Sequence, residues 1–270
     1  LAQAPDESID LAEASLWIAR EEYPDLDIAA YLHRLDGYAA NLKGRLPRQA
    51  GVELKIQALN RYLFEDLGFT GNAMDFYDPR NSFLNEVMDR KLGIPITISV
   101  IYIETARRIG LELAGVSFPG HFLVKLPVDE GVVVLDPFNG GITLGEMDLQ
   151  RRLQQTYGHE NTLAHAPLQS VLATASKKDI IVRMLRNLKG VYIQRDEFAK
   201  ALPIMHRIIQ LVPEDADEYR DRGVVHQALE CFRAAAIDYE DYLRLKPNAP
   251  DAATVGERVA ELARHLSHLH

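Results

Sequence analysis

The chain of 270 residues contains a single cysteine and a single tryptophan. One thiol cannot form an internal disulfide framework or a paired-cysteine motif, so this composition fits a reducing cytoplasm. The sequence also lacks an excess of positive charge, because its formal net charge is −9 and it has no long run of lysine or arginine. Binding to the phosphates of a nucleic acid is therefore not expected.

Long hydrophobic segments are missing as well. The longest uncharged apolar stretch, GIPITISVIYI, is closed by Glu104 and falls far short of the roughly 20 residues that span a bilayer. The first residues, LAQAPDESID, have neither the basic nor the apolar part of a secretory signal. A Walker-type phosphate loop, a dinucleotide-binding glycine motif and an HExxH zinc motif are absent. We therefore expect no membrane association, a cytoplasmic location, no cofactor and no metal site.

The remaining composition is that of a globular protein, with 47% hydrophobic and 26% charged residues. Apolar residues recur at helical spacing near the N-terminus and predict two helices, the second capped by Asp27. More helix is expected in GVELKIQALNRYLFEDLGF. The segment FLNEVMDRKLG predicts a helix that Asn81 or Ser82 caps and that ends at Gly93, with Asn85 at a solvated position.

The segment IPITISVIYIETARRIG is ambiguous. Its β-branched residues favour a strand, whereas its length and Pro95 at a first helical position favour a buried helix that ends at Gly110. We predict the helix. Three short strand-like runs follow, LELAGVSF, HFLVKL and GVVVLD, separated by Pro-Gly and Asp-Glu-Gly turns. A buried helix followed by an antiparallel sheet is an α+β arrangement.

Two residues of this sheet can carry chemistry. His121 opens the second predicted strand after a Pro-Gly turn, and Asp136 closes the third. Adjacent antiparallel strands can bring the two side chains together at one end of the sheet. A carboxylate that accepts a hydrogen bond from Nδ1 would leave Nε2 facing outward as a general base. The alternative is a purely structural histidine–aspartate hydrogen bond.

The order of these features resembles the transglutaminase-like core of the papain-type superfamily. The resemblance implies a Cys-His-Asp triad whose cysteine stands at the N-terminus of the buried helix, where the helix dipole favours the thiolate. His121 matches the histidine of that triad and Asp136 the aspartate. The segment RRIGL matches the end of the family helix, and counting back from it without gaps places Pro95 where the cysteine would stand. The family nucleophile is therefore missing.

The same predicted helix carries two other possible nucleophiles. Thr97 and Ser99 carry the nearest hydroxyls, and Ser99 lies one helical turn beyond Pro95 on roughly the same face. Ser99 could act as a weak candidate nucleophile only with His121 within hydrogen-bonding reach. The alternative is that both hydroxyls bond to backbone carbonyls inside the helix. Cys231, far along the chain and beside Glu230, is expected to be an inert packing residue.

A closer resemblance covers about residues 10 to 250. The segments NSFLNEVMDRKLGIPITISVIY, GVSFPGHFLV and DPFNGG are similar to the SirB-type branch, which implies a bacterial protein with tetratricopeptide-like helices after the transglutaminase-like domain. The last third supports this independently, because two segments align at the tetratricopeptide period of 34 residues. The aligned pairs are Phe198 with Phe232, Ala201 with Ala235, Leu211 with Leu245, and Pro213 with Pro247.

The predicted fold is therefore α+β, a transglutaminase-like core with N-terminal helices, followed by an all-α tetratricopeptide-like domain. The expected parts are residues 1–80 (N-terminal helical part), 81–145 (core), 146–180 (helical linker) and 181–270 (repeats and a capping helix).

Two functions follow from this architecture. The missing cysteine and the repeats favour a non-catalytic module that binds a protein or peptide partner in its cleft and on its repeats. The alternative is a hydrolase or acyltransferase in which His121 and Asp136 act with water or with a hydroxyl such as that of Ser99. An open cleft at the imidazole would favour the enzyme, and a plugged cleft would favour the binding module.

Overall fold

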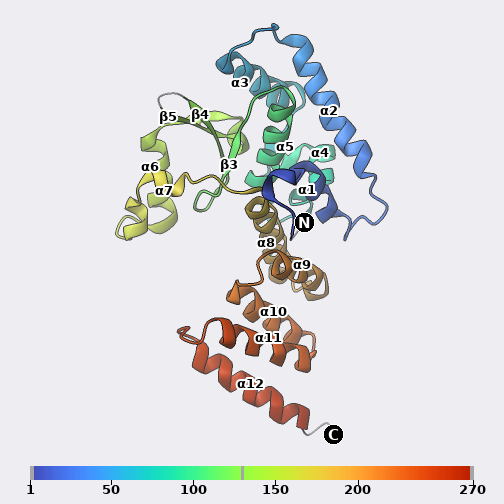
Figure 1. The fold of residues 1–270 in the computed structure, drawn as a ribbon, viewed down its shortest axis with the longest axis vertical. Coiled ribbons are helices and arrows are strands. Elements are labelled where there is room, and N and C mark those ends of the chain that lie inside the picture. The colour runs from blue at the N-terminus through green and yellow to red at the C-terminus, as the bar shows by residue number, and fades with distance from the viewer. Residues whose placement is uncertain (1–2, 129–130, 268–270) are drawn as a thin grey trace. The chain divides into compact units, whose positions relative to one another are not determined.

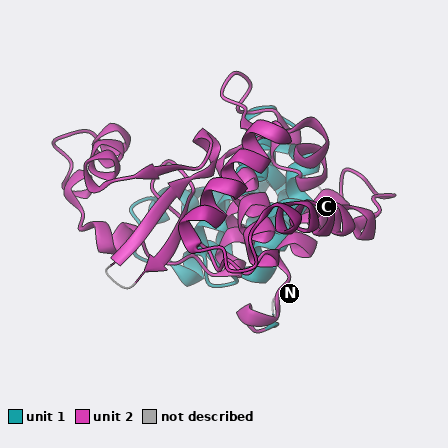
Figure 2. Ribbon diagram, turned by 90° about the horizontal axis from the view of Figure 1, so that it is seen from above, with its two compact units in different colours: residues 1–4, 185–270 teal, residues 5–184 magenta. Residues whose placement is uncertain are grey.

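The computed structural model describes residues 3–128 and 131–267. The chain forms two compact units, which Figure 2 shows in different colours. Residues 5–184 make up the first unit, and the residues from Leu185 onward, grouped with those up to Ala4, make up the repeat unit. Helix α8 (Lys177–Gln194) supplies its residues up to Met184 to the first unit and the remainder to the repeat unit.

The first unit is built around one buried helix, α5 (Pro95–Arg108), in which every residue from Pro95 to Ala106 is buried. Its end lies close to the predicted Gly110, which has a left-handed φ of 71°. The predicted buried helix is confirmed. The helices that contact α5 are α1 (Leu11–Ala19), α2 (Ile28–Arg45), α3 (Val52–Asn60), which continues into a π-helical turn (Arg61–Asp66), and α4 (Leu84–Arg90) (Figure 1).

Local chemistry explains where these helices begin. The carboxylates of Asp10 and Asp27 accept hydrogen bonds from the backbone N–H groups of the first turns of α1 and α2, so the predicted cap at Asp27 is confirmed. Helix α5 begins with a proline at its first position, and the Thr97 hydroxyl accepts from the Ile94 N–H at 3.1 Å. Because α5 is covered by other elements on all sides, its apolar residues need no polar face.

The predicted cap of α4 is wrong. The N-cap residue is Phe83, and the side chain of Asn81 is fully buried and donates instead to the carbonyl of Asp75 at 2.6 Å. The helix also ends at Arg90, before the predicted Gly93. Asn85 is 4% exposed, so its predicted solvated position is wrong too. The segment Pro79–Asn81 and helices α1 and α5 contact α4, and a pattern in the local sequence does not show these contacts.

The sheet of the first unit is a four-stranded antiparallel meander of β3 (Ala114–Val116), β4 (Leu123–Val128), β5 (Gly131–Asp136) and β6 (Ile142–Leu144). The first three strands were predicted and are confirmed, whereas β6 was not anticipated. The turn predicted between β4 and β5 includes Asp129 and Glu130, which lie outside the described residues. A separate two-residue parallel pair, β1 (Thr70–Gly71) and β2 (Leu92–Gly93), lies just before α5.

Two helices lie beside the sheet, α6 (Glu146–Tyr157) and α7 (Leu168–Val171) (Figure 1). They form a second apolar core with the strands, which comprises Val116, Phe118, Leu123, Val134, Leu144, Leu149, Leu153 and Leu172. Burial of these side chains fixes α6 against the end of the sheet where His121, in the turn before β4, and Asp136, at the end of β5, lie.

The repeat unit consists of helices that pack against their neighbours in chain order. After the last part of α8 come α9 (Phe198–Leu211), α10 (Ala216–Ala228), α11 (Phe232–Leu245) and α12 (Ala252–Ser267) (Figure 1). This is the predicted tetratricopeptide-like arrangement. The helices α10 and α11 approach closely at Gly223, where a Cβ would lie 2.7 Å from the Tyr239 ring. Cys231 is exposed, so its predicted packing role is wrong.

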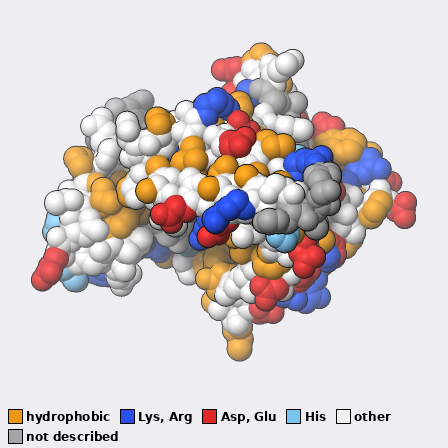
Figure 3. All heavy atoms as spheres, turned by 90° about the horizontal axis from the view of Figure 1, so that it is seen from below, with side chains coloured by type: hydrophobic (Ala, Val, Ile, Leu, Met, Phe, Trp, Pro, Cys, Tyr) orange, Lys and Arg blue, Asp and Glu red, His pale blue; other side chains and the backbone are white. Residues whose placement is uncertain are grey.

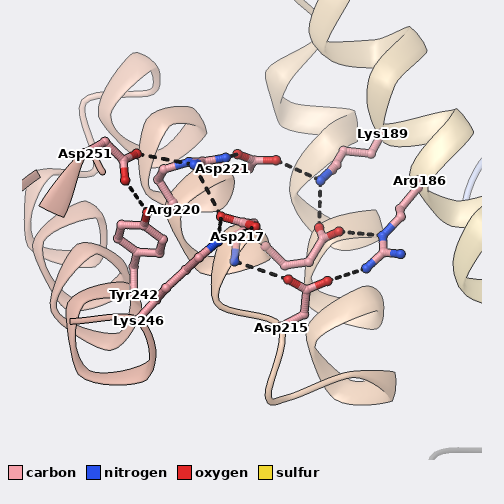
Figure 4. Close-up of polar contacts among 10 residues, drawn as sticks. Arg186, Lys189, Asp215, Asp217, Arg220, Asp221, Tyr242, Lys246 and Asp251 are labelled. Atoms are coloured by element: carbon pink, nitrogen blue, oxygen red, sulfur yellow. Dashed lines mark hydrogen bonds and ion pairs between the residues drawn. The ribbon is translucent and has the colours of Figure 1, made fainter. Parts of the chain in front are cut away.

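Charged side chains join the helices of the repeat unit (Figure 4). Glu218 of α10 is almost fully buried and accepts from Arg186 Nε and from Lys189 Nζ of α8, both at 2.7 Å. Such a buried carboxylate needs both cations, because an unpaired charge in this position would be costly. The pairs therefore fix the register of α8 against α10.

The surface carries mixed charge. Acidic and basic side chains are interspersed with apolar ones over the face shown in Figure 3. Among the residues that the structure describes, no helix combines the length and the apolar character that crossing a lipid bilayer requires.

Candidate functional site

His121 and Asp136 meet at the end of the sheet, as the sequence predicted. The distance from His121 Nε2 to Asp136 Oδ1 is 2.9 Å. The predicted use of Nδ1 is wrong, because Nε2 faces the carboxylate and Nδ1 is the other nitrogen. His121 also lies before β4, in a turn where its N–H donates to the Phe118 carbonyl at 3.0 Å. Val124 pairs with Leu135, so Asp136 stands opposite Leu123, two residues after His121. The His121 side chain must therefore extend toward β5, and Nε2, the ring nitrogen farther from the backbone, contacts the Asp136 carboxylate.

Asp136 is fully buried and contacts three donors. Besides the imidazole, Asn139 Nδ2 donates to Oδ2 at 2.7 Å, and the Arg152 guanidinium forms an ion pair with the same oxygen at 2.7 Å. Burial raises the pKa of Asp136, but the hydrogen bonds from His121 and Asn139 and the charge of Arg152 outweigh it and lower the pKa to about 2. The carboxylate is therefore ionised at neutral pH and fixes the orientation of the imidazole.

The turn that carries His121 is held by Arg183, from the part of α8 that belongs to the first unit. Its NH2 group donates to the His121 carbonyl at 2.6 Å, and both terminal nitrogens lie 3.4 Å from the Phe118 carbonyl. The guanidinium also lies over the Phe122 ring. No carboxylate of the described residues pairs with Arg183, and burial lowers its pKa. A half-buried cation whose hydrogen bonds go to the backbone of one turn stabilises that turn.

The His121 imidazole packs against an aromatic ring. The His121 and Phe138 rings pack edge to face with centroids 5.7 Å apart. On its other side, Phe138 lies so close to Gly71 that a side chain at position 71 would overlap it. Gly71 pairs with Gly93, just before α5, and α5 itself contacts the segment Pro137–Asn139. The start of the buried helix is thus connected to the imidazole through Phe138.

In the part of the chain that the structure describes, neither candidate hydroxyl of α5 bonds to the imidazole. Pro95 is buried at the first position of α5. The Thr97 hydroxyl donates to the Asn81 carbonyl at 2.8 Å, which agrees with the backbone-bonded alternative. Ser99 Oγ is fully buried and forms no hydrogen bond with any described residue, so it bonds neither to a carbonyl nor to His121. The Tyr102 hydroxyl bonds to Asn60 at 2.7 Å, inside the core.

The imidazole lines an open pocket of about 350 Å³, and the His121 side chain is 15% exposed. The cleft is therefore not plugged. The pocket is mostly polar and is lined by Pro119, Gly120, His121, Asn139, Arg152, Gln155 and Thr156. Among residues 3–128 and 131–267, no cluster of three or more histidine, cysteine or acidic side chains could hold a metal ion.

Three residues of this site, Asn139, Arg152 and Arg183, were missed by the sequence analysis. Asn139 belongs to the segment DPFNGG and stands three residues after Asp136, so the local turn could have indicated it. Arg152 and Arg183 come from helices that follow the sheet, and no local pattern connects either arginine with His121.

Comparison with known proteins finds the same two regions. Residues 29–186 match the family model of the transglutaminase-like superfamily, and residues 188–260 match that of the tetratricopeptide repeat. A UPF0162 protein of Xylella fastidiosa is 42% identical over 100% of this chain and 96% of that protein. A UPF0162 protein of Pseudomonas aeruginosa is 32% identical over 97% and 93% of the two chains. Protein SirB1 of Salmonella typhimurium is 25% identical over 93% and 91%.

Proposed function

Because this chain belongs to the transglutaminase-like superfamily, in its UPF0162 and SirB1 branch, we propose that it is a non-catalytic module that binds a polypeptide segment beside His121. The observation that supports this proposal is the start of α5, where a buried proline stands at the position at which the family resemblance would place the cysteine. Neither candidate hydroxyl of α5 replaces the missing thiol, because Thr97 bonds to the backbone and Ser99 forms no hydrogen bond with the imidazole. The Thr156 hydroxyl in the pocket donates to the Arg152 carbonyl. A cytoplasmic setting is part of the proposal, since one thiol is typical of a reducing compartment.

The chemistry of the pocket suits a peptide backbone. When Nε2 donates its proton to the ionised Asp136, the neutral imidazole keeps Nδ1 as an acceptor. The side-chain amides of Asn139 and Gln155 line the same pocket and can donate or accept. The Thr156 hydroxyl donates to the Arg152 carbonyl and can accept from a ligand. These groups can satisfy the N–H and C=O groups of an extended segment, which lose their hydrogen bonds to water on binding.

The repeats supply the second part of the proposal. Tetratricopeptide repeats generally mediate protein interactions, and solenoid repeats do so through extended surfaces. We therefore propose that the repeat unit binds a protein partner and that the pocket beside His121 binds a segment of that same partner. Linking two weak contacts in this way raises affinity through effective concentration.

Selection of peptides from a random displayed library on the intact protein tests the pocket. Enriched peptides would be labelled, and their dissociation constants measured by fluorescence anisotropy. We expect Gln155→Trp, which places an indole in the pocket from an exposed position of α6, to weaken binding at least tenfold. Gln57→Trp, at an exposed position of α3, is the matched control and should leave binding unchanged. Equal binding by both variants would contradict the assignment of the pocket.

A hydrolase is the second candidate function, and the open pocket favours it. An imidazole oriented by an ionised carboxylate can take a proton from a water molecule that attacks an acyl group. The test is incubation of the intact protein with a panel of peptide amides and activated esters. Hydrolysis that disappears in His121→Ala and persists in Cys231→Ala would support the enzyme and overturn the non-catalytic proposal. Absence of turnover at every tested pH, together with peptide binding, would support the binding module.

A further inference from the structure

A second cavity lies in the first unit, between the sheet and helices α6 and α7. Its volume is about 620 Å³, within the range of roughly 300–1,000 Å³ that is typical of small-molecule sites. Apolar side chains dominate its walls, with Pro127, Val132, Val134 and Leu144 from the strands and Leu149 and Leu172 from the helical side. The cavity shares no lining residue with the pocket beside His121.

The register of the strands explains why these side chains form one wall. Pro127 pairs with Val132, and Lys125 pairs with Val134, which in turn pairs with Leu144. Side chains two residues apart on a strand share one face of the sheet. Lys125 is therefore on the same face as the apolar residues, and its side chain lines the cavity.

Lys125 is the feature that points to a ligand. Its ammonium donates to the Leu172 carbonyl at 2.6 Å, which uses one of its three N–H donors. No carboxylate of the described residues forms an ion pair with it. Among the described residues of the lining, the one carboxylate is that of Glu146, which is exposed to solvent. Lys125 therefore offers a positive charge and two further N–H donors to a ligand that enters this mostly apolar cavity.

We propose that this cavity binds an amphipathic anion, an aliphatic carboxylate whose carboxyl group pairs with Lys125 and whose chain lies between the sheet and α6–α7. The chain would remove its methylene groups from water against the valine and leucine side chains, while the carboxylate would pair with the Lys125 ammonium. This inference is independent of the polypeptide binding proposed for the pocket beside His121.

Isothermal titration calorimetry of the intact protein with hexanoate, octanoate and decanoate tests the proposal. Affinity should increase about fourfold for each added methylene group until the cavity is filled. Octanol, which has no charge, should bind about tenfold more weakly than octanoate, and octylamine should not bind detectably. Equal binding of octylamine and octanoate, or no binding of any of the carboxylates, would overturn the proposal.

Four variants locate the site. Lys125→Met keeps the apolar length of the side chain and should weaken octanoate binding about tenfold, whereas Lys125→Arg should bind octanoate within about threefold of wild type. Ala173→Trp adds a large side chain at an exposed lining position and should abolish binding. Ala40→Trp, at an exposed position of α2, is its control and should bind normally. Unchanged binding in Ala173→Trp would place the ligand elsewhere and overturn the proposal, even if Lys125→Met failed to fold.

Discussion

Asp136 shows how the surroundings of one residue decide its charge. Full burial on its own would keep the carboxyl group protonated more readily than in water, yet the pKa of Asp136 is about 2. The donors that reverse the effect of burial are His121, Asn139 and Arg152. The ionised state of Asp136 is therefore part of the folded structure, and protonation of this group opposes folding.

The first prediction concerns pH. Because the folded pKa of Asp136 lies below its ordinary value of 3.8, the stability that this group contributes is present above about pH 4. It is lost as the pH falls toward 2, and it amounts to roughly 2 kcal/mol. Asp136→Asn should lower the free energy of unfolding at pH 7 by about 2–4 kcal/mol, since Arg152 loses its partner. Urea denaturation between pH 7 and 3 measures the free energy of unfolding of wild type and of Asp136→Asn. The difference between the two free energies should become smaller at low pH.

Asp148→Asn is the control for this prediction. Asp148 lies on α6 and is nearly half exposed, with its Arg151 partner at 3.8 Å. Its carboxylate also accepts from the Gly145 N–H at 3.1 Å, and the side-chain oxygen of asparagine can accept the same hydrogen bond. Its replacement should change the free energy of unfolding by less than about 1 kcal/mol. A constant gap between wild type and Asp136→Asn over the whole pH range would contradict the depressed pKa of Asp136.

The second prediction concerns Arg183, which we infer to be a positioning residue for His121. Arg183→Met removes the donors to the His121 and Phe118 carbonyls and should lower the free energy of unfolding by about 1–3 kcal/mol. The His121 ring signals in ¹H–¹⁵N NMR spectra should also shift or broaden, because the turn is no longer held. Arg183→Lys can still donate to one carbonyl, so its free energy of unfolding and its His121 ring signals should lie between those of Arg183→Met and wild type. Ring signals that stay unchanged in Arg183→Met would rule out the positioning role.

At the scale of single elements, tertiary packing determined the secondary structure of segments whose local sequence was ambiguous. The β-branched residues of α5 suit a strand, but the segment forms a helix because other elements cover it on every side. The strands β3, β4 and β5 could be predicted because alternation and turn residues are local signals. The three-residue β6 could not, since so short a strand exists only by pairing with β5.

The third prediction compares two glycines in helices of the repeat unit. Gly223→Ala should lower the free energy of unfolding by about 1–3 kcal/mol, because its Cβ would overlap the buried Tyr239 ring. Gly256→Ala in α12 meets no atom within 4 Å and should instead raise it by about 0.5–1 kcal/mol through better helix propensity. Chemical denaturation of both variants measures the difference. Effects of the same sign would show that the contact between α10 and α11 is looser than described.

At the scale of the whole molecule, the two units are not equally able to fold alone. The first unit has a buried helix, a sheet and two apolar cores, whereas the repeat unit has two repeats and a final helix. Two repeats are fewer than the three that such arrays usually need for stability. The first part of α8 belongs to the first unit and is buried there. Its buried residues are Ile180, Ile181, Val182 and Met184.

The fourth prediction follows from this difference. A fragment of residues 180–270 should be partly unfolded, because its first residues lose their burial and the short array cannot cover its outer apolar faces. Thermal unfolding followed by circular dichroism should show a broad transition at lower temperature than in the intact protein. A sharp transition at the temperature of the intact protein would mean that the repeats are stable on their own.

The sequence by itself determined the features that depend on spacing along the chain. Helical periodicity, strand alternation and the repeat of 34 residues predicted the α+β unit and the tetratricopeptide-like helices. The order of the strands predicted the meeting of His121 with Asp136, and the absent thiol at Pro95 is a fact of the sequence alone. Only the tertiary structure decided that Nε2 faces the carboxylate and that Ser99 is isolated from the imidazole. It also decided that Arg152 and Arg183 hold the site. These contacts join segments far apart in the chain, and packing of the whole unit, rather than any local preference, fixes which distant side chains meet.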